Sequence, residues 1–131
     1  HGLVEQKDTL DWWLKQSIAA QKVLDLATSG RCLGLPEALE DFAEFVRGRK
    51  NARVWGNGAN FDNPLLAVAY EKTGIKPSWQ YWNERCYRTL KNLAPHIKME
   101  RSGTHHNALD DAKSQARHLL KIVQQSTLTL A

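Results

Sequence analysis

Apolar side chains recur at intervals of three and four residues in five stretches of the chain, which is the pattern of amphipathic helices. The clearest stretch is residues 36–49, where one face carries Leu39, Phe42, Ala43 and Val46. Its acids lie in the first half and its bases at the end, which suits the helix dipole. The same spacing predicts helices over residues 8–28, 63–73, 86–93 and 107–125.

The residues that flank these stretches support their limits. Pro36 and Pro64 fall in first turns, where proline is well tolerated, and Gly74 closes the helix over residues 63–73. Within residues 8–28 we expect a break near Gln16–Ser17. The last helix is expected to turn one apolar stripe toward a neighbour, formed by Ala108, Ala112, Ala116, Leu119 and Val123.

Strands are scarce beside these helices. Residues 52–56, Ala-Arg-Val-Trp-Gly, are short and apolar and lead into a glycine loop, so they predict a buried strand. The aromatic-rich residues 77–84 fit either a loop or a short strand. Because a lone buried strand leaves both edges unpaired, two explanations stay open. Either a partner strand is overlooked, or the rest of the sheet lies in sequence outside these residues.

Composition narrows the class of protein. The chain has 131 residues, of which 42% are apolar and 24% charged, as in a globular domain. No apolar run is long enough to cross a membrane, so we expect no membrane partner. Cys32 and Cys86 form neither a disulfide framework nor a Cys-x-x-Cys metal motif, and a reducing, cytoplasmic setting is the expectation.

Charge is divided unevenly along the chain. Residues 1–46 carry 8 acids and 4 bases, whereas residues 47–131 carry 6 acids and 14 bases, and the net charge is +4. A basic half suits a polyanionic partner, although an ordinary solvated lysine and arginine surface explains it equally well. The first residue is His1 and the one methionine is Met99, so we expect a cut or cloned N-terminus, with residues 1–2 as a tag or processing remnant.

One candidate cluster directly follows the predicted strand. Asn60-Phe61-Asp62-Asn63-Pro64 comes after the glycine loop and at a helix start. A carboxylate placed there is exposed at the end of a sheet, where α/β folds bind ligands. The alternative is purely structural: Asp62 caps the helix and Asn60 is a turn residue.

A second cluster lies at the start of the last helix, in the sequence His105-His106-Asn107-Ala108-Leu109-Asp110-Asp111-Ala112. His106 sits at the edge of a polar loop, and Asp111 lies about one and a half turns into the helix. A carboxylate there can hold a divalent metal ion, and the imidazole can act as a general base on water. Alternatively, Asp110 and Asp111 are first-turn acids and His106 is a surface residue.

Taken together and in this order, the two clusters resemble the second and third motifs of the DnaQ-like (DEDDh) 3′–5′ exonucleases, which have a ribonuclease H-like fold. Further stretches are similar to the branch found in bacterial and phage-derived exonucleases named exodeoxyribonuclease VIII-like or exoribonuclease-like. These stretches are Thr9–Trp13 with Gln16-Ser17, then Trp55–Asp62, and then Asn83–Leu90. The resemblance spans residues 8 to about 125.

The resemblance implies roles for matching residues. Asp62 and Asp111 would be metal-binding carboxylates, and His106 the general base that deprotonates the attacking water. Two divalent ions, Mg²⁺ or Mn²⁺, would clamp the attacking and leaving oxygens. The substrate implied is the 3′ end of single-stranded DNA or RNA, cleaved to nucleoside monophosphates. Four residues are candidates for substrate binding: Asn60, Phe61, Trp13 and Arg88.

The chain departs from the family pattern in one respect. The first motif of these exonucleases, Asp-x-Glu on the opening strand, occurs nowhere in the 131 residues. We therefore expect residues 1–131 to be one incomplete exonuclease domain of the α/β class. It would be a helix-rich C-terminal portion that lacks the N-terminal strands and is inactive by itself.

Other interpretations stay open at this point. The chain could be a non-catalytic remnant that binds nucleic acid, or an interaction module whose exposed sheet edge pairs with another chain. A homodimer is compatible with the resemblance. The remaining aromatic and basic residues have a packing or surface explanation beside the nucleic-acid one, and His96 and His118 are expected at the surface.

Overall fold

A computed structural model describes residues 3–126, with six α-helices and two short strands among them. His1 and Gly2, which were interpreted as a tag or processing remnant, lie outside the described residues. In chain order, the elements are α1 (Lys7–Trp13), α2 (Ile18–Thr28), α3 (Leu35–Arg47), β1 (Val54–Gly56), α4 (Asp62–Thr73), the 3₁₀ turn η1 (Tyr81–Asn83), β2 (Glu84–Cys86), α5 (Tyr87–Leu93) and α6 (Ala108–Gln124). The chain forms two compact units, and each is described by itself.

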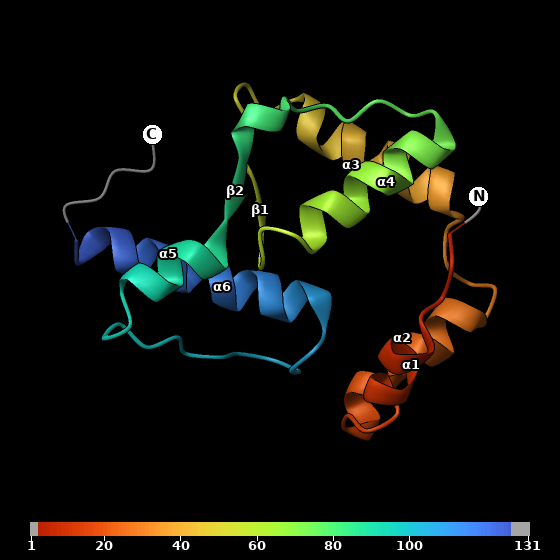
Figure 1. Ribbon diagram of the computed structural model, residues 1–131, viewed down its shortest axis with the longest axis horizontal. Coiled ribbons are helices and arrows are strands. Elements are labelled where there is room, and N and C mark those ends of the chain that lie inside the picture. The colour runs from red at the N-terminus through yellow and green to blue at the C-terminus, as the bar shows by residue number, and fades with distance from the viewer. Residues whose placement is uncertain (1–2, 127–131) are drawn as a thin grey trace. The chain divides into compact units, whose positions relative to one another are not determined.

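The first unit, Leu33–Thr89, is built on a strand–helix–strand arrangement (Figure 1). β1 and β2 are parallel, with Val54 opposite Glu84 and Gly56 opposite Cys86. The expected strand over residues 52–56 is therefore confirmed in its last three residues. A partner strand was indeed overlooked: it begins at Glu84, the last residue of the aromatic stretch, and the rest of that stretch is loop and 3₁₀ turn.

The core of this unit lies between α3 and α4, which run side by side in Figure 1. The predicted face of α3 is confirmed: Leu39, Ala43 and Val46 are buried, and Phe42 packs against them. Tyr70 of α4 is 2% exposed, and its hydroxyl donates to the Leu39 carbonyl at 2.9 Å. This hydrogen bond joins the two helices inside the core.

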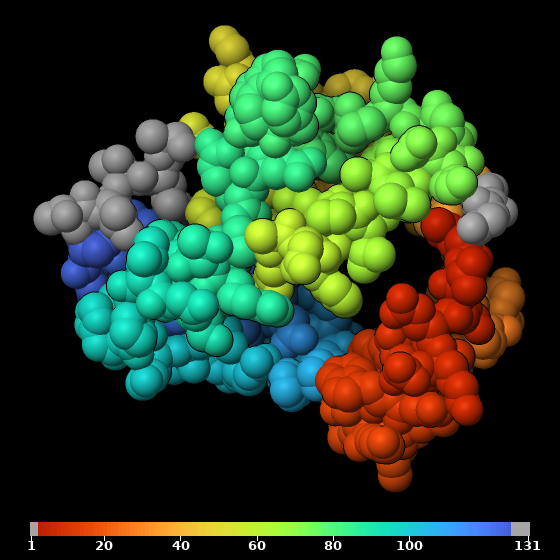
Figure 2. Space-filling view, viewed as in Figure 1, coloured from red at the N-terminus to blue at the C-terminus, as the bar shows by residue number. Residues whose placement is uncertain are grey.

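The second unit combines Val4–Cys32 with the described part of Leu90–Ala131. The expected break in the first helix is confirmed, because α1 ends at Trp13 and α2 begins at Ile18. Ser17 causes the restart, since its hydroxyl accepts from the Ala20 N–H at 3.3 Å and caps α2. This segment, red to orange in Figure 2, exposes several large apolar side chains. They are Val4, Leu14, Ile18 and Leu26.

α6 buries a different face from the one expected. Ala108, Ala112 and Ala116 of the predicted stripe are exposed, and Leu119 is the buried member. The buried face is formed instead by Ser114, His118, Leu119 and Ile122. Two polar residues can lie there because the neighbouring loop provides partners for both: the Ser114 hydroxyl accepts from the Ser102 N–H at 3.1 Å, and His118 Nε2 lies 2.8 Å from the Ile97 carbonyl.

The prediction that His118 is a surface residue is therefore wrong: its side chain is 3% exposed. His96 is exposed, as expected. Of the cysteines, Cys32 is exposed and Cys86 half-buried, and both are free thiols. Among the described residues, no helix combines the length and the apolar character that crossing a membrane requires.

Candidate active site

The first group of predicted site residues lies at the carboxyl ends of the two parallel strands. β1 ends at Gly56, and α4 starts at Asp62 after a five-residue loop. Gly56 allows this tight return, because a Cβ atom on it would lie 2.9 Å from Asn63 Oδ1 and 3.1 Å from Asp62 Cβ. Asp62 is thus held against the strand end while its side chain stays exposed.

The backbone of one residue, Asn57, connects Asp62 to Arg88. The backbone N–H of Asn57 donates to Asp62 Oδ2, and the Asn57 carbonyl accepts from Arg88 Nη2 at 2.7 Å. Arg88 belongs to α5, which follows β2 directly, so both strand ends contribute to the group. The result is a carboxylate and a guanidinium on either side of one loop, at the place where α/β sheets bind ligands.

Asn60 and Phe61 lie in the same loop, and both are exposed. Phe61 is 58% exposed and occupies the N-cap position of α4. The structural alternative that Asp62 caps the helix is therefore wrong in detail, since Asp62 is the first helical residue and binds the Asn57 N–H. An exposed aromatic ring beside an exposed amide can stack on a base and bond to it.

The second group lies at the start of α6. Asn107 caps this helix, with its side-chain oxygen accepting from the Leu109 and Asp110 N–H groups at 3.2 Å. The two acids that follow hold the preceding loop: Asp110 Oδ2 accepts from the Thr104 N–H at 2.8 Å, and Asp111 Oδ2 from the His106 N–H at 3.2 Å. Asp111 is half-buried and fixed directly beside His106, as the spacing predicted.

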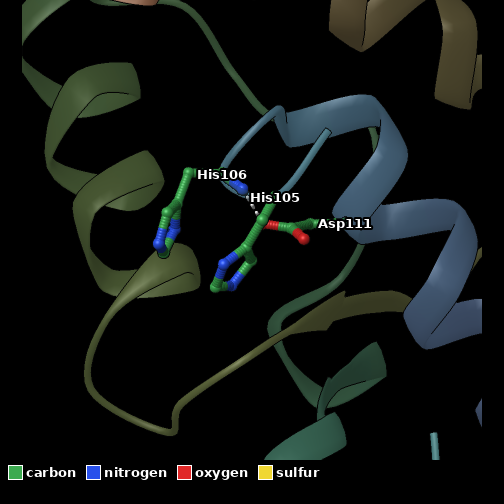
Figure 3. A group of neighbouring side chains, drawn as sticks. All are labelled: His105, His106 and Asp111. Atoms are coloured by element: carbon green, nitrogen blue, oxygen red, sulfur yellow. Dashed lines mark hydrogen bonds between the residues drawn. The ribbon is translucent and has the colours of Figure 1, made fainter. Parts of the chain in front are cut away.

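His106 has a backbone conformation that is rare for a residue with a side chain. Its φ angle is +65°, in the left-handed region, where histidine is more tolerated than most residues. Such strain is usually kept at functional sites. This conformation turns the His106 N–H toward Asp111, which Figure 3 marks with a dashed line.

Aromatic rings surround the His106 imidazole. Its centroid lies 4.9 Å from the ring of Trp12 and 5.8 Å from that of Trp13, both at steep angles. The two indole rings also meet each other edge to face, with centroids 5.3 Å apart. Trp13 is thus beside His106 as the site hypothesis needs, and Trp12 is a further neighbour that the sequence reasoning did not select.

His105 is the second residue that sequence reasoning missed. Its ring stacks on that of His106, with centroids 3.7 Å apart and planes 24° from parallel (Figure 3). One ligand atom each from His105, His106 and Asp111 lie within 4.8 Å of one another. The signal that could have found His105 is simply that two histidines are adjacent at the helix start.

Arg101 adds a positive charge beside His105, His106 and Asp111. Its guanidinium donates to Asp111 Oδ1 at 2.8 Å, so both carboxylate oxygens have a donor. Asp62 and Asp111 offer the oxygen ligands that Mg²⁺ and Mn²⁺ prefer, and in this respect they fit the expected ions. A cation on Asp111 would have to displace Arg101 from Oδ1 or bind the other oxygen, which accepts the His106 N–H.

A cysteine next to Arg88 has a shifted pKa. Cys86 ends β2, and a hydrogen bond from the Thr89 side chain lowers the pKa of its thiol. Burial opposes this effect, and the backbone N–H groups of Thr89, Arg88 and Gly58 add to it. Gly58 belongs to the loop that leads to Asp62, so this strand end supplies several donors that stabilise negative charge.

Comparison with known proteins identifies a family for the chain. A family profile described as the 3′–5′ exoribonuclease Rv2179c-like domain matches residues 1–123, which is most of the chain. No curated protein and no solved structure matched in the other two comparisons. The expectation of a 3′–5′ exonuclease family, and with it of a hydrolytic nuclease domain, is confirmed at that level. The chain belongs to the family of 3′–5′ exoribonuclease Rv2179c-like domains.

Proposed function

We propose that residues 1–131 belong to one metal-dependent 3′–5′ exonuclease domain of the DnaQ-like (DEDDh), ribonuclease H-like class. The domain would hydrolyse the terminal phosphodiester of single-stranded RNA or DNA and release nucleoside monophosphates. The observation that carries the proposal is the pairing of His106 with Asp111 at the start of α6, in a family described as 3′–5′ exoribonucleases.

In this proposal His106 is the general base. Its imidazole takes the proton of the water that attacks the terminal phosphorus, which a positioned histidine can do near neutral pH. Two features support the role: the strained backbone at φ +65° and the indole rings of Trp12 and Trp13 around the imidazole. Both restrict the positions that the ring can take, and positioning is what general-base catalysis needs.

Asp62 and Asp111 supply carboxylate ligands for two divalent ions, Mg²⁺ or Mn²⁺. When bound, such ions stabilise the charge that develops on the attacking and leaving oxygens. Asp111 is fixed for this role by the His106 N–H, and Asp62 by the Asn57 N–H. Removing either carboxylate should lower activity without unfolding the core, because neither side chain is part of a buried cluster.

Four residues are the candidates for binding the substrate end. Arg88 is a phosphate ligand in the proposal, since guanidinium groups bind phosphate in two-point fashion. Phe61 and Trp13 offer ring faces for bases, and Asn60 an amide for a sugar or base edge. The family description favours RNA over DNA as the substrate.

The 131 residues contain no Asp-x-Glu, so two of the four carboxylates of the class are missing from them. We therefore propose that the chain alone hydrolyses nothing, because two carboxylates and one imidazole are too few ligands for a two-metal pair. A non-catalytic nucleic-acid-binding role is the second candidate, and the net charge of residues 47–131 favours it.

The test compares two proteins on a 5′-labelled single-stranded RNA with Mn²⁺. One is the 131-residue chain, and the other is the product of the complete reading frame that encodes it. The longer product should carry an Asp-x-Glu and shorten the RNA stepwise from its 3′ end. In that protein His106→Asn should lower the rate by roughly 10²–10⁴-fold, the usual contribution of a general base.

His106→Asn is the sharp variant because asparagine also tolerates the left-handed region and keeps the loop in place. The matched control is His96→Asn, at an exposed histidine outside the cluster, which should leave the rate unchanged. A complete product that binds RNA but never shortens it would favour the non-catalytic role. Hydrolysis by the 131-residue chain that Asp111→Ala removes would contradict its proposed inactivity.

A further inference from the structure

We infer that His105, His106 and Asp111 form a binding site for an imidazole-preferring divalent ion, with Zn²⁺ as the best fit. It shares Asp111 with the oxygen-ligated Mg²⁺ or Mn²⁺ of the proposed reaction and differs in taking two imidazole nitrogens. One consequence rests on the proposed function. Zinc bound there would occupy the His106 imidazole, so that it could no longer take a proton from the attacking water, and hydrolysis would be inhibited.

The geometry supplies three ligands close together. One donor atom from each residue lies within 4.8 Å of the others. Donors on one tetrahedral zinc ion lie about 3.3–3.6 Å apart, because each bond is about 2.0–2.2 Å long. The side chains therefore have to close by up to about 1.5 Å, a movement that the exposed side chain of His105 can make by rotation.

The surroundings favour a bound ion over a chance cluster. The two imidazole rings already lie close together, with centroids 3.7 Å apart and planes 24° from parallel. Because the nitrogen lone pairs lie in the ring planes, the His105 ring has to turn for both rings to point at one ion. Trp12 and Trp13 contact the His106 ring and cover part of it with apolar surface. An apolar shell of this kind strengthens the attraction between ligands and cation.

The ligand types decide between metals. Two imidazole nitrogens and one carboxylate suit zinc and its transition-metal neighbours, whereas Mg²⁺ takes oxygen ligands almost exclusively. Three protein ligands leave a fourth position for water, an arrangement that zinc commonly adopts. Magnesium should therefore compete weakly for this site even at large excess.

Arg101 opposes the ion in the metal-free state. Its guanidinium holds Asp111 Oδ1 at 2.8 Å and places a positive charge beside the site. Zinc must displace it or use the other oxygen, which accepts the His106 N–H. Replacing Arg101 with glutamine removes the competing charge, so Arg101→Gln should bind zinc more tightly than the unchanged chain.

The experiment measures zinc binding by the 131-residue chain in competition with a chromophoric zinc indicator, without nucleic acid. We expect one tight zinc per chain. His105→Asn should weaken it at least about tenfold, which is the smallest loss usually seen even for a group one step removed from a metal. His105 suits the test because its side chain forms no hydrogen bond within the described residues, so folding should be unaffected.

His96→Asn is the matched control, since it removes an exposed histidine outside the cluster. Binding that is weakened by His105→Asn, unchanged by His96→Asn and tightened by Arg101→Gln supports the site. Zinc affinity that His105→Asn leaves intact, or that His96→Asn lowers equally, overturns it. Far-ultraviolet circular dichroism on each variant shows whether the fold is kept.

The inhibition is tested separately, on the complete reading-frame product with Mn²⁺. Zinc should slow hydrolysis in the unchanged protein and have at least about tenfold less effect in His105→Asn, which keeps the base His106. Zinc binding without any hydrolysis would contradict the proposed function and leave the zinc site standing. Hydrolysis that zinc slows equally in both proteins would contradict the inhibition.

Discussion

At the scale of single residues, the site depends on the close approach of two side chains, those of Asp62 and Asn63, to the backbone of Gly56. Gly56 ends β1, and no side chain fits on it, because the start of α4 lies within 3.1 Å of where a Cβ would be. Its φ angle is not in the left-handed region, so crowding alone requires glycine here. Asp62 owes its position to this contact.

Gly56→Ala should therefore push Asp62 and Asn63 away from the strand end. We expect the free energy of unfolding to fall by about 1–3 kcal/mol, as for other overpacked positions. Urea denaturation measures this loss. Gly48→Ala is the matched control, since nothing lies within 4 Å of its added methyl group and its φ is −72°, and a similar loss in both variants would contradict the account.

Thr89 should control the reactivity of Cys86, because its hydroxyl is the largest cause of the lowered pKa. Thr89→Val removes that hydrogen bond and should raise the pKa of the thiol, so that less thiolate is present at neutral pH. The measurement is the pH profile of iodoacetamide alkylation, in a Cys32→Ser background. The profile should move to higher pH in Thr89→Val; an unmoved midpoint would show that the threonine has no such effect.

At the scale of elements, the first unit depends on the contact of α3 with α4. Tyr70 crosses between them, and burial raises the pKa of its phenol. Tyr70→Phe keeps the ring but loses the hydrogen bond to Leu39, and it should lower the free energy of unfolding by about 1–2 kcal/mol at neutral pH.

The same variant should respond differently to alkali. A raised pKa in the folded state means that the contribution of Tyr70 is complete below the ordinary value of about 10 and is lost as pH rises beyond it. The difference in stability between the unchanged chain and Tyr70→Phe should thus shrink above about pH 10. Urea titrations across that range measure it, and a difference that grows with pH would refute the assignment.

An element of this chain can be predicted from sequence when local residues stabilise it, and not when contacts with other segments do. α3 could be predicted because its buried residues follow helical spacing, and the restart of α2 because Ser17 is a good cap. β2 could not, since Glu84–Cys86 is not an apolar stretch and becomes a strand by pairing with β1. The buried face of α6 was missed because its polar members, Ser114 and His118, find hydrogen-bond partners in the loop before the helix, which helical spacing does not reveal.

In the candidate site too, contacts set by local spacing could be predicted and contacts set by packing could not. The contact between His106 and Asp111 could be predicted, because the two residues are five positions apart across the start of a helix. The contacts of His105 and Trp12 with His106 depend on the φ angle of one residue and on ring packing between separate segments. Hydropathy and spacing contain no information on either.

At the scale of the whole molecule, the chain combines a nuclease family match with a basic half that carries the candidate site. Residues 47–131 hold 14 bases against 6 acids, and Asp62, His106 and Asp111 all lie among them. Excess positive charge suits a polyanionic substrate, while the carboxylates provide the negative charge that divalent ions need. Because the 131 residues lack Asp-x-Glu, the proposal assigns to them only the recognition of nucleic acid. It assigns hydrolysis to the complete protein.

The most direct test of this account is the pattern of products from a 5′-labelled single-stranded RNA in Mn²⁺. The product of the complete reading frame should shorten the RNA from its 3′ end and release nucleoside monophosphates, so that the labelled fragments form a ladder. Asp111→Ala should lower that rate at least about 10²-fold, and chelating the metal should stop it. Internal cleavage, or shortening that survives Asp111→Ala, would contradict the account.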